Sequence, residues 1–174
     1  GTPYLGVNRN KRSLAMNLKS PDGPSVLRRL AQEADILVEN FRPGTLEKYG
    51  CGAEELRRLN PRLIYASVSG YGHNGPRRDL AGYDPVLQAE AGLMDITGPA
   101  DGAPSRVGVA MTDYIAGQFL FSSILLALRD RDRTGRGQMV DISLFDSILA
   151  TMTLPAGIFF ATGAKPQRLG NQHP

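Results

Sequence analysis

The sequence predicts an α/β fold: a Rossmann-like parallel sheet with helices on both of its faces. Over residues 13–70, short apolar segments typical of strands alternate with amphipathic segments of helical period. A further strand-like segment, 138–144, follows a long apolar helix. Strands separated by helices form βαβ units, in which the strands run parallel.

The first expected strand and helix lie near the N-terminus. The segment "SLAMNL" (13–18) alternates apolar and polar residues, which is typical of a strand. Ser20 followed by Pro21 predicts the beginning of a helix, because serine caps free amides and proline suits the first turn. Residues spaced by three or four are expected on its buried side: Val26, Leu27, Leu30, Ala31 and Ala34.

Two more strands and two short helical segments complete the first half of the chain. The apolar segments "DILVEN" (35–40) and "LIYASVSG" (63–70) are the expected strands. Between them we expect a helical turn over 45–49 and an amphipathic helix over 53–61.

The second half of the chain is expected to be mainly helical. A helix is predicted near 85–93 and a long one over 112–132. The turn "RTGRG" then leads into the strand 138–144, and an apolar helix is expected over 145–162.

Composition and charge favour an ordinary globular domain. A chain of 174 residues with 41% hydrophobic and 21% charged residues can form one domain with its own core. The net charge of +3 is dispersed, so we expect no nucleic-acid partner, and the one basic cluster, 8–12, is expected to be solvated.

Neither a membrane span nor a metal site is predicted. The charge-free segment 114–128 is shorter than the roughly 20 residues that cross a bilayer, so a buried core helix is expected there. The single cysteine, Cys51, allows no internal disulfide, and no metal-ligand spacing of cysteine or histidine occurs. A reducing, cytoplasmic setting is therefore expected.

Two loops rich in glycine and proline, 70–76 and 97–108, are the expected functional loops. In the first, Gly70, Gly72 and Gly75 match the G-x-G-x-x-G pattern of dinucleotide-binding folds. That pattern needs a helix to begin at the third glycine, and the next helix is expected about ten residues later. The glycines therefore do not by themselves predict an NAD site.

The polar residues of the first loop leave two possibilities open. Arg77 and Arg78 either bind an anionic ligand at the carboxyl edge of the sheet or lie in solvent. His73 and His173 are the only histidines, so the sequence does not favour a histidine-dependent catalytic triad or a multi-histidine metal site. His73 is expected to face solvent.

Asp113 lies at the beginning of the long apolar helix, and two interpretations of it are open. An acid or threonine at this place commonly caps the helix, because its oxygen accepts free backbone N–H groups. Alternatively, a carboxylate between a Gly- and Pro-rich loop and apolar residues is a partly desolvated nucleophile or base. Both roles can coexist.

Six segments in order resemble the family III CoA-transferases, also described as the CaiB/BaiF family, which includes formyl-CoA transferase and the α-methylacyl-CoA racemases. The similarity runs from about Asn8 to the end of the chain. The six segments are "VNRNKRSLAMNLKSPDG", "ILVENFRPGTLEKYG", "NPRLIYASVSGYGHNGP", "AGYDPVLQAEAGLM", "GVAMTDYIAG" and "RTGRGQMVDISLFDS".

The resemblance implies an enzyme that transfers CoA from an acyl-CoA to a free carboxylic acid, with acyl-CoA as substrate and no tightly bound cofactor. The family's catalytic aspartate falls on Asp113. It implies attack on the thioester, followed by aspartyl anhydride and aspartyl-CoA intermediates. The residues that the resemblance places against CoA are Met16, Asn17, Leu18, Lys19, Asn40, Phe41, Arg42, Lys48, Ala81, Gly82, Tyr83 and Asp84.

Tyr83 favours transferase over racemase activity. In the racemases a histidine precedes the aspartate of this segment and acts in proton transfer, whereas tyrosine, with a reference pKa near 10, is a poor base at neutral pH. A 2-methylacyl-CoA racemase is the alternative enzyme. A nucleotide-binding Rossmann module without catalysis is the alternative of another class. The sequences of these segments are similar to those of family members that use succinyl-CoA and small dicarboxylates.

Family members are longer than this chain and form interlocked homodimers. The resemblance implies that residues 1–174 are a fragment of the large, Rossmann-like domain. The N-terminal segment and the C-terminal small domain would then lie outside it.

Overall fold

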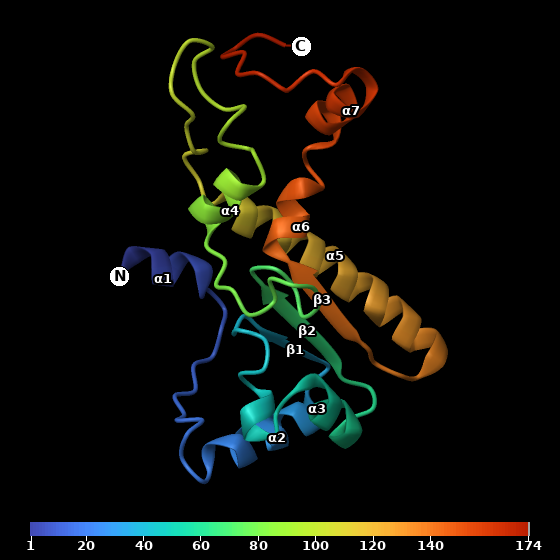
Figure 1. The fold of residues 1–174 in the computed structure, drawn as a ribbon. Helices are drawn as coiled ribbons and strands as arrows, with labels where there is room; N and C mark the ends of the chain where they lie inside the picture. The colour runs from blue at the N-terminus through green and yellow to red at the C-terminus, as the bar shows by residue number, and fades with distance from the viewer. Residues whose placement is uncertain (174) are drawn as a thin grey trace.

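The centre of the molecule is a three-stranded parallel sheet (Figure 1). The structure, a computed structural model, describes residues 1–173. The strands β1 (Ile36–Glu39), β2 (Ile64–Ser69) and β3 (Met139–Ser143) lie in the order β1-β2-β3. The predicted α/β class with a parallel sheet is confirmed.

Helices cover both faces of this sheet, because the first residues of β2 are apolar toward both faces. Tyr65 points to the face covered by α2 (Gly23–Glu33) and α3 (Ala53–Leu59), where Leu56 is fully buried. The short 3₁₀ helix η1 (Glu47–Tyr49) contributes to the same cluster. Ala66 points to the other face, which is covered by α5 (Met111–Thr134).

A third cluster forms where the carboxyl ends of the strands meet the remaining helices. Leu87 of α4 (Asp84–Glu90), Ala116 of α5 and Leu144 of α6 (Leu144–Leu149) are buried together. This cluster holds α4 beside the first turn of α5 (Figure 1). The other two helices, α1 (Thr2–Val7) and α7 (Thr153–Thr162), lie toward the outside of the molecule.

The expected strand at 13–18 is wrong. This segment lies outside helices and strands, and Ser13 to Asn17 are exposed. An alternating pattern indicates a segment with one apolar side, but a strand also needs a neighbouring strand for its backbone hydrogen bonds. Among the described residues β1 pairs with β2 alone, so segment 13–18 has no strand partner. Ser20 accepts the N–H of Gly23 at 3.1 Å, but α2 begins at Gly23 with Asp22 at its N-cap, so the expected beginning at Pro21 is wrong. Leu30, expected on the buried side, is 50% exposed.

The expected single helix over 145–162 is two helices, α6 and α7. They are separated at residues 150–152. Pro155 explains the break, since its ring would clash with the carbonyl of Thr151 in a continuous helix and it has no N–H to donate.

The expectation of a buried α5 is also wrong. Only Thr112, Ala116, Ala127 and Arg131 of this helix are buried. Its length and mean hydropathy would also suit a membrane span, but a single helix of this kind is weak evidence for one. Here α5 packs along one face of the sheet and leaves apolar side chains exposed on its other side, including Phe121 and Leu126.

Two glycines bring the loop after β2 close to the segment before α4. A Cβ on Gly70 would lie 2.6 Å from the backbone nitrogen of Gly82. Neither position has room for a side chain, so the backbone of Gly70 lies in contact with that of residues 81–82. This contact forms part of the pocket described below.

Gly82→Ala is expected to destabilise the fold by about 1–3 kcal/mol, because the new methyl group would push the two backbones apart. Gly117→Ala is the matched control, since nothing lies within 4 Å of the place that its methyl group would take in α5. That variant should gain up to about 1 kcal/mol from helix propensity. Urea denaturation of both variants measures the difference, and equal effects would contradict the close contact.

Candidate active site

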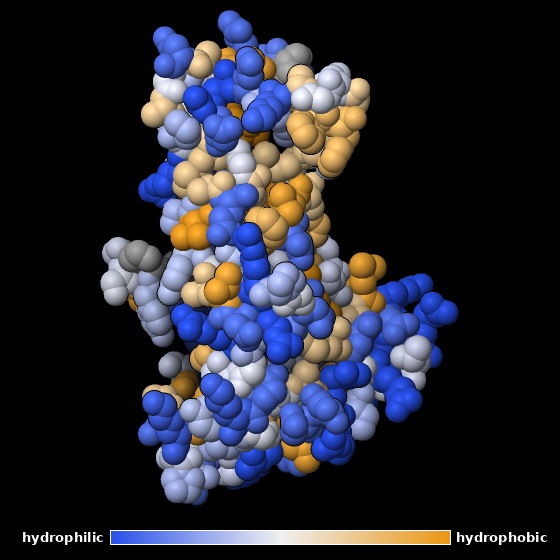
Figure 2. Space-filling model, in the orientation of Figure 1, coloured by the Kyte–Doolittle hydropathy of each residue, from blue (hydrophilic) through white to orange (hydrophobic). Residues whose placement is uncertain are grey.

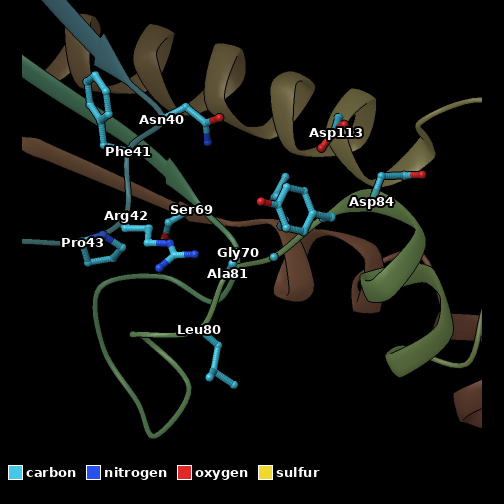
Figure 3. Close-up of a pocket in the computed structure, with 13 residues that line it drawn as sticks. Asn40, Phe41, Arg42, Pro43, Ser69, Gly70, Leu80, Ala81, Asp84 and Asp113 are labelled. Carbon is cyan, nitrogen blue, oxygen red and sulfur yellow. The ribbon is translucent and has the colours of Figure 1, made fainter. Parts of the chain in front are cut away.

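A pocket of about 290 Å³ opens at the carboxyl edge of the sheet, where parallel folds place their ligands (Figure 3). One wall is the turn after β1, residues 40–43. The other is made by Ser69 and Gly70 at the end of β2 and by residues 80–84. Asp113 of α5 lies at one end of the pocket in Figure 3.

Eight of the thirteen candidate residues meet in this pocket. They come from three separate parts of the chain: Asn40, Phe41, Arg42, Ala81, Gly82, Tyr83, Asp84 and Asp113. The other five, Met16, Asn17, Leu18, Lys19 and Lys48, do not line it. Lys19 and Lys48 are both exposed.

Asp113 is the third residue of α5 and does not cap it. The N-cap position is Ala110, and no side chain at this end makes a cap hydrogen bond from within the helix. Among the described residues the Asp113 carboxylate accepts no hydrogen bond, so both of its oxygens are available to a ligand. Of the two interpretations, helix capping by Asp113 is wrong.

The environment of Asp113 disfavours its charged form. Although the side chain is accessible from the pocket, partial burial raises the pKa of the Asp113 carboxyl above its usual value. The negative charge of Asp84 raises the pKa further.

Asp84 supplies the cap that α5 lacks. Its Oδ1 accepts the backbone N–H of Thr112 at 2.9 Å, which satisfies one of the free amides of the helix. Its Oδ2 accepts a bond from Nε2 of Gln88, also at 2.9 Å. Gln88 Oε1 in turn accepts the N–H of Val107, so the loop leading to α5 is held as well. Asp84 is buried and both oxygens are engaged, so it positions Asp113.

The far wall of the pocket carries a cation. The Arg42 side chain is exposed and makes no hydrogen bond or ion pair with any other described residue. Its neighbour Asn40 is fixed, because Nδ2 donates to the carbonyl of Val68 at 2.5 Å. An unpaired guanidinium in a pocket is suited to a phosphate or carboxylate group.

The arginines of the glycine-rich loop are paired with acids. Arg77 lies 2.7 Å from Glu90 and over the ring of Tyr71, and Arg78 lies 3.6 Å from Asp79. No helix begins at Gly75, because the next one is α4. The structure therefore lacks the helix N-terminus that an NAD site would use.

The expectation that His73 faces solvent is wrong. Its side chain is only 18% exposed, and its Nε2 lies 2.8 Å from Oγ of Ser67. The glycines beside it suggested a mobile loop, but no local pattern signals that polar side chains of the strands receive the ring.

Several residues of the site were missed by sequence reasoning. Ser69 and Leu144 line the pocket because strands β2 and β3 end there. The ends of predicted strands could have indicated them. Gln88 was missed because a glutamine in an amphipathic helix is ordinarily solvated, whereas here it is fully buried.

Comparison with known proteins identifies the family. The model of CoA-transferase family III matches residues 1–174. This chain belongs to CoA-transferase family III. It is 43% identical over 172 residues to the succinyl-CoA:glutarate CoA-transferase of Mus musculus, covering 99% of the chain and 39% of that protein. It is 43% identical over 181 residues to the acetyl-CoA:oxalate CoA-transferase of Acetobacter aceti, covering 99% of the chain and 46% of that protein.

A solved structure agrees with this assignment to the CoA-transferase family. The crystal structure of a CaiB/BaiF family protein from Brucella suis superposes with a TM-score of 0.92 at 43% identity, covering 96% of this chain and 44% of that chain. The chain thus spans less than half of the length of each of these relatives.

Asp84→Ala is expected to lower the free energy of unfolding by about 1–3 kcal/mol, because the N–H of Thr112 and the amide of Gln88 lose their buried partner. Asp101→Ala is the control, since that exposed aspartate makes no hydrogen bond or ion pair with another described residue. Urea denaturation measures both variants. Equal stabilities would contradict the capping role of Asp84.

Asp113→Asn tests the raised pKa. A carboxyl whose pKa is higher in the folded than in the unfolded chain binds more protons when folded, so its contribution to stability falls as the pH rises through that window. Relative to the parent, Asp113→Asn should gain a few tenths of a kcal/mol, about 0.5, between pH 3 and pH 7, after allowance for solvent screening. Urea denaturation at both pH values measures this gain. A relative loss would indicate that the charge of Asp113 stabilises the fold.

Proposed function

We propose that the longer protein carrying this chain is a CoA-transferase that moves CoA from an acyl-CoA to a carboxylic acid, with Asp113 as nucleophile. The observation that carries the proposal is the Asp113 carboxylate itself. It lies free of internal hydrogen bonds in a pocket whose far wall presents the unpaired Arg42. Membership of CoA-transferase family III supports it.

The proposed reaction has two halves. An oxygen of Asp113 attacks the thioester carbonyl, forming a mixed anhydride and releasing CoA as a thiolate. The thiolate attacks the aspartyl carbonyl of the anhydride, which gives an aspartyl-CoA thioester and frees the donor acid. The acceptor carboxylate then attacks this thioester, and the released thiolate attacks the acyl carbonyl of the new anhydride, restoring Asp113.

Three features of the site suit this chemistry. Partial desolvation removes water that would compete with the thioester for the Asp113 oxygens. The first turn of α5 provides positive dipole character beside Asp113, which offsets part of the cost of holding its charge in the pocket. Arg42 is placed for a phosphate of CoA, as the carboxyl edge of a parallel sheet is the usual place for such a ligand.

The proposed substrates follow from the relatives. One relative is a succinyl-CoA:glutarate CoA-transferase and another an acetyl-CoA:oxalate CoA-transferase. We therefore propose a short acyl-CoA donor, such as succinyl-CoA, and a small dicarboxylate acceptor. Tyr83, 65% exposed at the pocket, offers no base for racemisation at neutral pH.

We further propose that residues 1–174 are part of the large domain of a cytoplasmic protein that acts as an interlocked homodimer and holds no tightly bound cofactor. Exposed apolar surface on these residues supports the proposal that another part of the dimer packs against them. Figure 2 shows such surface over α6 and α7, where Leu154 is 52% and Phe160 83% exposed. Contiguous apolar surface of this kind commonly marks an interface.

Trapping tests the proposed nucleophile. The longer protein is incubated with succinyl-CoA and then treated with hydroxylamine or borohydride, which react with activated aspartyl groups. Mass spectrometry should find the modification on Asp113, and Asp113→Ala should lose at least about a thousandfold in turnover. Asp101→Ala is the control and should keep the parental rate. Normal turnover by Asp113→Ala would rule out the mechanism.

A further inference from the structure

A row of three polar residues crosses the sheet one step before the pocket. In the strand register Glu39 of β1 pairs with Ser67 of β2, and Ser67 pairs with Asp141 of β3. Residues paired in this way point to the same face of a sheet. It is the face that Tyr65 shares, but here the loop after β2, and not a helix, lies over it.

His73 contacts all three members of this row. Its Nε2 lies 2.8 Å from Oγ of Ser67 and 4.0 Å from Oε1 of Glu39. Its backbone N–H donates to Oδ2 of Asp141 at 2.9 Å. One residue of the glycine-rich loop is therefore hydrogen-bonded to β2 and β3 and lies beside a carboxylate of β1.

Glu39 connects this loop to the opposite wall of the pocket. Its side chain is only 6% exposed, and its Oε2 accepts the backbone N–H of Phe41 at 2.8 Å. Phe41 belongs to the first wall of the pocket, and the loop that His73 holds leads to the second wall at Ala81 (Figure 3). A single buried carboxylate is thus bonded to the first wall and lies beside the loop that leads to the second.

The chemistry of the cluster favours a proton on Nε2 of His73. The carboxylate of Glu39 and the hydroxyl of Ser67 both face this nitrogen, and a lone pair there would oppose the buried negative charge. Asp141, the other charged group at the loop, is also acidic. No lysine or arginine pairs with Glu39 among the described residues, so the His73 ring is the side chain that pairs with it.

We propose that Glu39 and His73 are positioning residues for acyl-CoA binding: together they hold the two walls of the pocket at the separation that CoA requires. This inference rests on the proposed function, since CoA is taken as the ligand of the pocket. Neither residue touches the reacting atoms. Their effect should therefore fall on binding and not on the chemical step.

The test is the affinity of the longer protein for CoA, measured by calorimetry, together with KM and kcat for succinyl-CoA. Glu39→Ala and His73→Ala should each raise the Kd for CoA and the KM about tenfold, the size expected for loss of a hydrogen bond to a charged group. The kcat at saturating succinyl-CoA should stay within about twofold of the parent. Glu54→Ala is the control, because among the described residues that exposed glutamate pairs only with Arg58 on the outside of α3.

Conservative variants separate positioning from general damage to the fold. His73→Gln keeps a side-chain N–H for Ser67 and Glu39, and should restore most of the affinity that His73→Ala loses. Glu39→Gln keeps an acceptor for the N–H of Phe41 and should lie between the parent and Glu39→Ala. Each variant is compared at matched folded fraction, taken from its thermal unfolding curve.

Each outcome decides the proposal. Parental Kd values in both alanine variants would overturn it, as would equal losses in the alanine and glutamine variants. If the parent binds CoA but transfers none, the proposed function fails, while the Kd values still test the positioning role. If the parent binds no CoA, both proposals fail.

Discussion

The site depends on one hydrogen bond between two helices, from the N–H of Thr112 to the carboxylate of Asp84. A helix must satisfy its first amides, and an acid in the first turn would ordinarily do so. Because Asp84 does this from α4, the neighbouring Asp113 keeps both oxygens free. Partial burial raises the pKa of the Asp113 carboxyl, and the nearby charge of Asp84 raises it further. One aspartate thus caps the helix, while the other keeps its carboxylate free in the pocket.

The parallel sheet explains why residues far apart in the chain meet at this place. All three strands end at the same edge, so the segments that follow β1 and β2 become the two walls of the pocket. Gly70 and Gly82 allow the backbones of the second wall to approach each other without side chains between them. Packing of α4, α5 and α6 around Leu87 then fixes Asp113 relative to both walls.

For several of the wrong predictions, the missing information was the partner that a segment packs against or pairs with. The segment 13–18 has the alternation of a strand, but no strand lies beside it among the described residues. The sequence of α5 is as apolar as that of a core helix. Apolar residues cover a core and an interface alike, so the sequence does not indicate which of the two α5 faces. Lys19 and Lys48 lie outside the pocket, and no local pattern states which surface lysines approach a ligand. Those two residues remain predictions for CoA contact.

By itself the sequence determined the parallel α/β fold and the strands at 35–40, 63–70 and 138–144. It also determined the family, through six ordered segments of which one contains Asp113. These rest on periodicity and on ordered segments, which are local properties of the chain. Only the tertiary structure decided that Asp84 caps α5, that Asp113 is free, and that His73 is held over Glu39. These depend on contacts between residues 28 to 34 positions apart. The register of the sheet and the packing of the helices create such contacts, and no local sequence pattern indicates them.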